Sequence, residues 1–258
     1  MQLDAGCELI FDVTDFTPFV LMLRPRSGYG QWVSEERYTL LPIVPVVEFL
    51  DPFSNLCQRL VAPAGRFVVT ASAVVETAEA TDIEPGAPFT LVQNLPENAL
   101  QFLLPSRYCQ SDMLGGLVRQ VIGDAQPGYD QVELIRRWIH QNIEYRYGSS
   151  NASTSALETA SQKVGVCRDF AHLGIALCRS LNIPARIVVG YLQDLEPMDV
   201  HAWFEAYVAG RWYTFDATQE HPRGGRIALA YGRDAADVAL ATQFGPATLA
   251  EMRVWVKS

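Results

Sequence analysis

The residue pattern of this 258-residue chain changes once, near Pro105. Before that point, short runs of alternating apolar and polar residues are separated by turn-forming pairs such as Asp51-Pro52 and Pro85-Gly86, which is typical of antiparallel strands. After it, apolar residues recur at helical spacing, and three strand-like runs follow. The sequence therefore predicts an α+β fold with two domains, an N-terminal antiparallel β-rich domain over 1–105 and a core of helices packed on an antiparallel sheet over 106–258. The predicted N-terminal strands are 8–14, 19–24, 38–40, 46–50, 58–61 and 67–75.

The second part begins with helices. An apolar stripe at helical spacing predicts a helix over about 130–143, and Asp130 and Glu133 have the spacing of a capping box at its start. A shorter helix is expected over 155–161, after a polar loop. The longer helix should pack on the core beside the candidate site, and the shorter one precedes a turn at Gly165.

Cys167 stands at the head of the next helical segment. Phe170, Leu173 and Leu177 recur at helical spacing, and the segment stops before Pro184, so Cys167 falls in or near the first turn of a buried helix. A thiolate there faces the positive end of the helix dipole, which is worth only about 0.3 to 1 kcal/mol. Because so small a contribution does not by itself make a strong nucleophile, a neighbouring base is required.

Two strand-like runs, 201–208 and 211–218, contain a candidate base and its partner, His201 and Asp216, and are joined at Ala209-Gly210. A two-residue loop would put the imidazole and the carboxylate on one face of the hairpin as diagonal neighbours. A three-residue loop would put them on opposite faces, because a one-residue slip inverts a strand. We expect the two-residue loop.

Cys167, His201 and Asp216 are therefore the candidate catalytic residues. Taken singly, the cysteine and the histidine would more often be structural. Together with a carboxylate on the same face they favour nucleophilic catalysis by a thiol. His172 lies beyond the first turn of its helix, and we expect it to support packing or hydrogen bonding.

Composition and charge exclude several classes of function. A net charge of -9 without a dense Lys/Arg face argues against a nucleic-acid partner. The longest apolar run, 40–50, is broken by two prolines and a glutamate and falls short of the roughly 20 residues that span a bilayer, so no membrane association is expected. The opening residues lack the pattern of a signal peptide, which predicts a cytoplasmic protein. Five cysteines without a C-x-x-C pair predict reduced thiols and no zinc site.

Seven segments carry recognisable motifs: 104–108, 165–172, 182–186, 190–192, 201–203, 212–218 and 232–238. Through them the chain resembles the transglutaminase-like superfamily, in particular its bacterial two-domain members of cysteine-protease type with a β-rich N-terminal domain. The resemblance covers nearly the whole chain and implies a papain-like core in which Cys167 is the nucleophile, His201 the base and Asp216 its orienting partner. Two positions depart from the family pattern, Arg168 where relatives often carry Gln and Ala217 where Pro commonly follows the aspartate, and they put substrate preference in doubt more than activity. Animal members need calcium, but no acidic loop of that kind occurs here, so we expect neither a metal nor another cofactor.

The leading functional hypothesis is a cysteine hydrolase that cleaves an amide bond of a peptide or protein through a Cys167 thioester. The backbone N–H of Cys167 is a candidate oxyanion donor, with Tyr145 or Tyr147 as a weaker second candidate. One alternative is a protein-glutamine acyltransferase, a transglutaminase, that uses an amine acceptor. Another is a non-catalytic binding module. The sequence predicts neither the substrate nor the oligomeric state.

Overall fold

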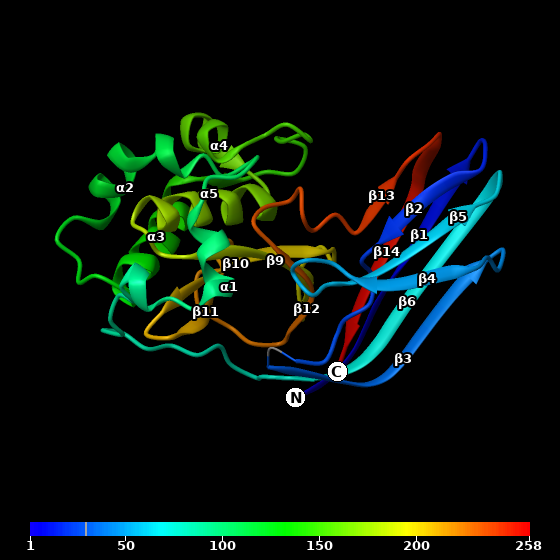
Figure 1. The fold of residues 1–258 in the computed structure, drawn as a ribbon, viewed down its shortest axis with the longest axis horizontal. Coiled ribbons are helices and arrows are strands. Elements are labelled where there is room, and N and C mark those ends of the chain that lie inside the picture. The colour runs from blue at the N-terminus through cyan, green and yellow to red at the C-terminus, as the bar shows by residue number, and fades with distance from the viewer. Residues whose placement is uncertain (29) are drawn as a thin grey trace.

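The computed structural model describes residues 1–28 and 30–258. Figure 1 shows a part rich in helices beside a part built of long strands. All the larger sheets are antiparallel, and the helices pack together on one of them, which confirms the predicted α+β class. Among the described residues, no helix has both the length and the apolar character needed to cross a bilayer.

The strand-rich part consists of two four-stranded sheets, with strand orders β14-β1-β6-β3 and β13-β2-β5-β4. Phenylalanines from both sheets meet in its core: the ring of Phe19 lies 5.0 Å from that of Phe11 and 6.0 Å from that of Phe67. The strands are β1 (Gln2–Val13), β2 (Thr17–Leu21), β3 (Gln31–Leu41), β4 (Val46–Leu50), β5 (Leu56–Ala62), β6 (Gly65–Thr77), β13 (Ala241–Gln243) and β14 (Ala247–Lys257).

Two of these strands come from the far end of the sequence. β14 pairs with β1 from Asp4 opposite Lys257 to Val13 opposite Ala247, and β13 pairs with β2. The prediction assigned 241–257 to the second domain, whereas strand pairing attaches these residues to the N-terminal sheets. The division into 1–105 and 106–258 otherwise stays a prediction.

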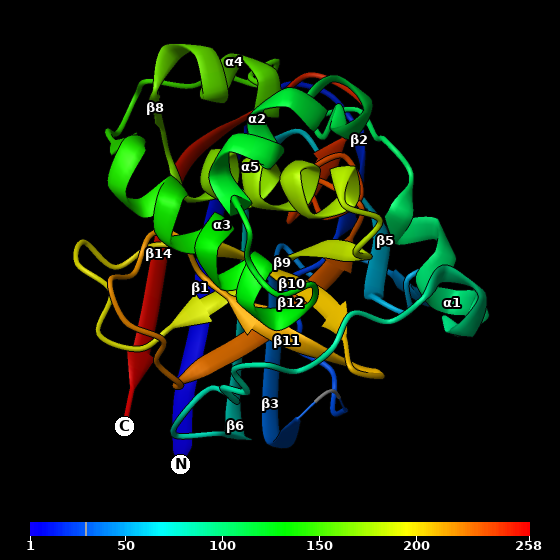
Figure 2. The ribbon, with the colours of Figure 1, turned by 90° about the vertical axis from the view of Figure 1, so that its left-hand side faces the viewer.

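The helical part packs on a third sheet, with strand order β11-β10-β9-β12. α5 contacts β10 and β9, and α3 contacts α5 and β11 (Figure 2). The strands are β9 (Ala185–Leu192), β10 (His201–Val208), β11 (Arg211–Phe215) and β12 (Arg226–Gly232). The helices are α1 (Glu97–Leu100), α2 (Gly115–Ile122), α3 (Tyr129–Asn142), α4 (Ala156–Gln162) and α5 (Cys167–Ser180), with 3-10 turns at Val92–Asn94, Gln101–Leu103 and Ser111–Met113. A parallel pair, β7 (Glu144–Tyr145) and β8 (Val164–Gly165), joins the segments before and after α4.

The predicted helices over 130–143 and 155–161 correspond to α3 and α4, but the capping of α3 differs from the prediction. Asp130 lies inside the helix and accepts a hydrogen bond from the Gly86 N–H, and Glu133 pairs with Arg136 and Arg137. The predicted capping box at Asp130 and Glu133 is therefore wrong, because Asp130 binds the distant Gly86 and Glu133 pairs with arginines one turn further along the helix.

The two parts share hydrophobic side chains. Tyr191, Ile227 and Leu229, from β9 and β12, are buried together with apolar side chains of the N-terminal sheets. The third sheet thus lies between its helices and the strand-rich part (Figure 1).

Candidate active site

Cys167 begins helix α5, and the backbone before it is fixed by Asp169. The Val166 N–H donates to Asp169 Oδ2 at 2.9 Å, and the Asp169 N–H donates to the Val166 carbonyl at 2.9 Å. Asp169 is fully buried. These reciprocal contacts hold the first turn of α5, so the thiol is presented at the N-terminal end of a capped helix.

The β10–β11 hairpin has the predicted two-residue loop. Val208 pairs with Arg211, and both loop residues, Ala209 and Gly210, have positive φ angles of 49° and 83°. Two consecutive positive φ angles are typical of the type I′ turn that matches the twist of paired strands. The ladder continues to Phe204 opposite Phe215, so Asp216 lies one residue beyond the end of β11.

This register brings His201 and Asp216 together. His201 Nε2 lies 2.7 Å from Asp216 Oδ2, and both side chains are buried. The same-face prediction from the two-residue loop is confirmed by this contact.

Asp216 is held by three residues. Oδ2 also accepts a hydrogen bond from Arg226 Nη2 at 2.9 Å, while Oδ1 accepts bonds from the Thr218 N–H at 3.0 Å and the Thr218 hydroxyl at 2.7 Å. Burial alone would raise the pKa of this carboxyl. The charges of His201 and Arg226, together with these hydrogen bonds, outweigh burial and hold the pKa of Asp216 well below its usual range.

The Cys167 side chain completes the cluster. Burial lowers the pKa of His201, but the charge and hydrogen bond of Asp216, with a further contribution from Cys167, raise this pKa to about 9. Cys167 raises the pKa of His201 both through its charge and through a contact between the two side chains, so the thiol lies beside the imidazole. His201 Nδ1 has no other partner among the described residues, whereas Nε2 is occupied by Asp216. Nδ1 is therefore the nitrogen available to exchange a proton with the thiol.

Tyr145 lies next to Cys167. Burial raises the pKa of the Tyr145 hydroxyl and the neighbouring Cys167 raises it further, while a hydrogen bond with the Cys167 backbone acts in the opposite direction. The ring of Tyr145 packs 5.7 Å from that of Phe170 and 5.4 Å from that of Tyr147.

His172 has the supporting role expected of it. Its Nε2 accepts a hydrogen bond from the Ala235 N–H at 3.1 Å, and its ring stacks on that of Tyr108 at 5.1 Å. Burial lowers the pKa of His172 to about 3, so the ring is neutral.

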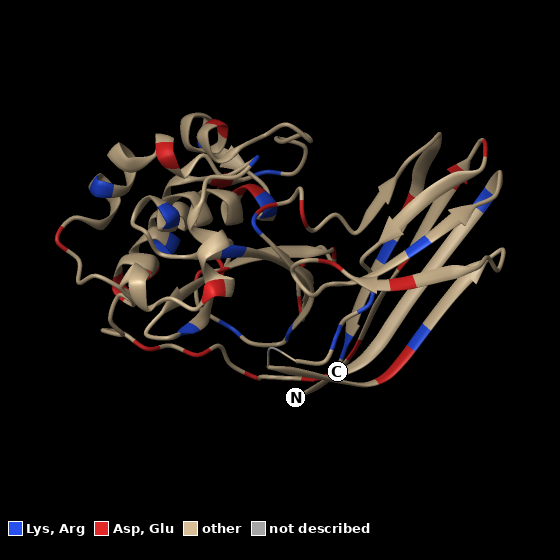
Figure 3. Ribbon diagram, in the orientation of Figure 1, with Lys and Arg blue, Asp and Glu red and all other residues tan. Residues whose placement is uncertain are grey.

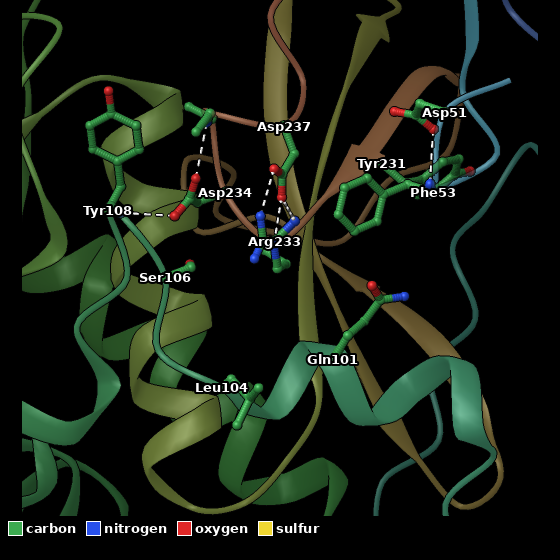
Figure 4. Close-up of polar contacts among 12 residues, drawn as sticks. Asp51, Phe53, Gln101, Leu104, Ser106, Tyr108, Tyr231, Arg233, Asp234 and Asp237 are labelled. Carbon is green, nitrogen blue, oxygen red and sulfur yellow. Dashed lines mark hydrogen bonds and ion pairs between the residues drawn. The ribbon is translucent and has the colours of Figure 1, made fainter. Parts of the chain in front are cut away.

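The segments 104–108 and 232–238 lie side by side and both contact α5. The Tyr108 N–H donates to Asp234 Oδ2 at 2.8 Å, and Arg233 pairs with Asp237 (Figure 4). Arg179 of α5 donates to the carbonyls of Leu104 and Arg233 at 2.9 and 2.6 Å. These contacts connect α5 with the segment after β12.

The sequence did not identify Arg226 and Thr218 as residues that hold Asp216 in place. Thr218 follows Asp216 by two residues, a spacing at which local hydroxyl and amide bonds to a carboxylate are common, so it had a local signal. Arg226 had none, because the irregular segment between Asp216 and β12 has no periodicity that predicts its path.

Lys and Arg are scattered among Asp and Glu over both parts of the molecule (Figure 3). Within the described residues, no three His, Cys, Asp or Glu side chains gather as metal ligands would. The expected metal independence remains a prediction.

Comparisons with known proteins agree with this arrangement. The family described as transglutaminase-like superfamily matches residues 115–217, which include Cys167, His201 and Asp216. A crystal structure of a candidate cysteine protease from Cytophaga hutchinsonii is 38% identical, covers 100% of this chain and 90% of that one, and superposes with a TM-score of 0.93.

Two similar mycobacterial proteins are uncharacterized. One from Mycobacterium leprae is 29% identical over 84% of this chain and 82% of its own length. One from Mycobacterium tuberculosis is 35% identical over 39% of this chain and 37% of its own length. The family match contains all three side chains of the cluster, and the Cytophaga likeness extends over the whole chain, so this protein belongs to the transglutaminase-like superfamily.

Proposed function

We propose that this protein is a thiol-dependent acyl-transfer enzyme that hydrolyses an amide or peptide bond. One observation carries the proposal: the Cys167 thiol lies beside a buried imidazole whose other nitrogen is bonded to Asp216 at 2.7 Å. Nucleophile, base and orienting carboxylate are the parts that covalent catalysis by a thiol requires.

In the acylation step, the sulfur of Cys167 attacks the substrate carbonyl carbon after its proton has passed to His201 Nδ1. As the tetrahedral intermediate collapses, the carbon–nitrogen bond breaks and His201 returns that proton to the leaving amine. The products of this step are an amine and a thioester on Cys167.

In the deacylation step, His201 takes a proton from a water molecule, whose oxygen attacks the thioester carbonyl. The carbon–sulfur bond then breaks, the carboxylic acid leaves, and the proton on His201 returns to the sulfur. Asp216 keeps the imidazole oriented and stabilises its protonated form throughout, and the carboxylate itself stays unprotonated.

Tyr145 is proposed as an oxyanion donor together with the Cys167 backbone N–H. The N–H stands at the start of α5, and the Tyr145 hydroxyl lies beside it. Two such donors would stabilise the negative oxygen of the tetrahedral intermediate.

Peptides or proteins are the proposed substrates. The Cytophaga protein is described as a candidate cysteine protease, and at 38% identity over the full chain its substrate class is a reasonable guide. Hydrolysis is proposed over transfer to an amine because water is present in vast excess over any amine and the Cys167 side chain is partly exposed.

Thiol labelling tests the proposal without a known substrate. Burial raises the pKa of Cys57 to about 11 and of Cys109 to about 12, and it also raises the pKa of Cys7 and Cys178, so these thiols should react slowly. Cys167 is the least buried of the five cysteines. Iodoacetamide at a pH of roughly 6 to 7, followed by mass spectrometry, should mark Cys167 first. Equal labelling of all five would falsify the proposal.

A matched pair of variants links the label to activity. Cys167→Ala should lower peptidase activity by at least about 1,000-fold, whereas Cys178→Ala, in the same helix but on its buried side, should keep it once folding is verified by circular dichroism. Activity that survives Cys167→Ala would reject the assignment. If a primary amine outcompetes water as acceptor, the enzyme is an acyltransferase instead.

A further inference from the structure

Arg226 contacts the same carboxylate oxygen as the imidazole. Its Nη2 lies 2.9 Å from Asp216 Oδ2, and His201 Nε2 lies 2.7 Å from that atom. Because both nitrogens touch one oxygen, the guanidinium and the imidazolium compete for the same negative charge at close range. Arg226 comes from β12, so it contributes to the cluster from a fourth segment.

The guanidinium has a fixed position. Arg226 is only 8% exposed, its Nε donates to the Arg223 carbonyl at 3.2 Å, and its guanidinium carbon lies 5.0 Å from the ring centre of Trp203. The Trp203 ring is itself stacked 6.2 Å from that of His201. Together with the bond to Asp216, these two contacts keep the charge of the buried arginine in one place.

We propose that Arg226 is a positioning residue that limits the proton affinity of His201. It fixes Asp216 Oδ2 and withdraws part of its negative charge from the imidazole. Without it, the full carboxylate charge would act on His201, and the imidazolium would hold its proton too tightly to return it to a leaving amine. This inference rests on the proposed function where it assigns His201 as the base.

The charged and titratable groups that face His201 in the described structure come from three elements. They are Asp216 after β11, Cys167 at the start of α5 and Arg226 in β12. Asp216 and a thiolate at Cys167 favour the imidazolium, whereas Arg226 is the positive charge among them. Its removal should therefore raise the pKa of His201.

Histidine titration by NMR tests this directly, because the chain has four histidines. The titration is made in the Cys167→Ala background, so that it does not depend on thiol chemistry. Arg226→Gln should raise the pKa of His201 by about one unit, and Arg226→Lys, which keeps the charge, should shift it by less than half as much. Arg226→Met keeps the stem that packs on Trp203 and serves as the neutral variant if the glutamine variant does not fold.

Arg186→Gln is the matched control. Arg186 lies on the same sheet, is 6% exposed, pairs with Glu205 at 2.6 Å and stacks 4.3 Å from the Trp212 ring, so its loss disturbs a comparable site. This variant should leave the pKa of His201 unchanged. An unchanged or lowered pKa in folded Arg226→Gln, or an equal rise in Arg186→Gln, overturns the inference.

A second measurement separates this inference from the proposed function. With Cys167 present, iodoacetamide should mark Cys167 first both in Arg226→Gln and in the unsubstituted protein, because His201 is still there to take the thiol proton. If Cys167 is not labelled ahead of the other thiols in the unsubstituted protein, the proposed function fails, while the histidine titration still decides the role of Arg226. If Cys167 is labelled first but the pKa of His201 does not rise in folded Arg226→Gln, the inference alone fails.

Discussion

At the scale of single residues, burial and charge separate histidines with different roles. His201 is buried beside a carboxylate, and its pKa is raised to about 9. His172 is equally buried, but burial dominates over the nearby Asp234, and its pKa is lowered to about 3. The surroundings therefore favour the protonated ring at His201 and the neutral ring at His172, although the ordinary pKa of both side chains is the same.

His172 should make the protein sensitive to acid. An unfolded histidine has a pKa of about 6.5, so below that pH the unfolded chain binds a proton that the folded chain refuses until about pH 3. Its contribution to stability is present above pH 6.5 and is lost as the pH falls. The free energy of unfolding, measured in urea, should drop by roughly 1 to 2 kcal/mol between pH 7 and pH 5 because of this residue.

Two substitutions check that assignment. His172→Gln, whose amide oxygen can still accept from the Ala235 N–H, should flatten the decrease between pH 7 and pH 5. His221→Gln serves as the control, because that side chain is 85% exposed. An equal decrease in His172→Gln and in the unsubstituted protein would show that other groups cause the acid sensitivity.

At the scale of elements, the distance between Cys167 and His201 depends on how closely α5 packs on β10. Gly174 makes this contact possible: a Cβ atom there would lie 2.5 Å from Phe204 Cε1. Phe204 is fully buried and stacks on Phe215, so it has little room to move. Because Gly174 has no side chain, α5 can pack close to β10. The distance between Cys167 on α5 and His201 on β10 therefore depends on this glycine.

Gly174→Ala should push α5 away from β10. We expect a loss of about 1 to 3 kcal/mol in the free energy of unfolding, as is usual for overpacking, and slower alkylation of Cys167 as the thiol moves from His201. Gly116→Ala in α2 is the control, because no atom lies within 4 Å of its added Cβ, and it should be neutral or stabilising by up to about 1 kcal/mol. Urea unfolding measures both, and a Gly174→Ala variant as stable as the unsubstituted protein would contradict the packing argument.

At the scale of the whole molecule, residues far apart in sequence complete the strand-rich part. β1 lies between β6 and β14, so 241–257 supply one neighbour of β1 and one neighbour of β2. Apolar side chains of β9 and β12 are buried in the same core. The two parts should therefore unfold together in one transition.

Removing residues 241–258 should destabilise the protein strongly. The shortened chain loses the ladder from Asp4 opposite Lys257 to Val13 opposite Ala247, which exposes the edge of β1 and its apolar side chains. We expect a midpoint of thermal unfolding at least about 10 °C lower and a tendency to aggregate. Removal of Ser258 alone, which lies outside β14, should change neither. A shortened chain with an unchanged midpoint would mean that the strand-rich part does not need these strands.

Local patterns in the sequence predicted much of this structure. The helical spacing of apolar residues predicted α3 and α5. The Ala209-Gly210 pair predicted the strand register that brings His201 next to Asp216. These features are local, because a turn or a helical repeat acts over a few residues. β3 is an exception: it was expected only at 38–40 but extends over Gln31–Leu41, because most of its side chains are exposed and the alternation is weak.

The sequence by itself determined which elements form around Cys167 and on which face of its hairpin His201 lies, because both depend on residues close together in the chain. Only the tertiary structure decided that Arg226 shares an oxygen of Asp216 and that β13 and β14 return to the N-terminal sheets. Such contacts join segments separated by irregular chain, and their selection depends on the packing of the whole core rather than on any local pattern.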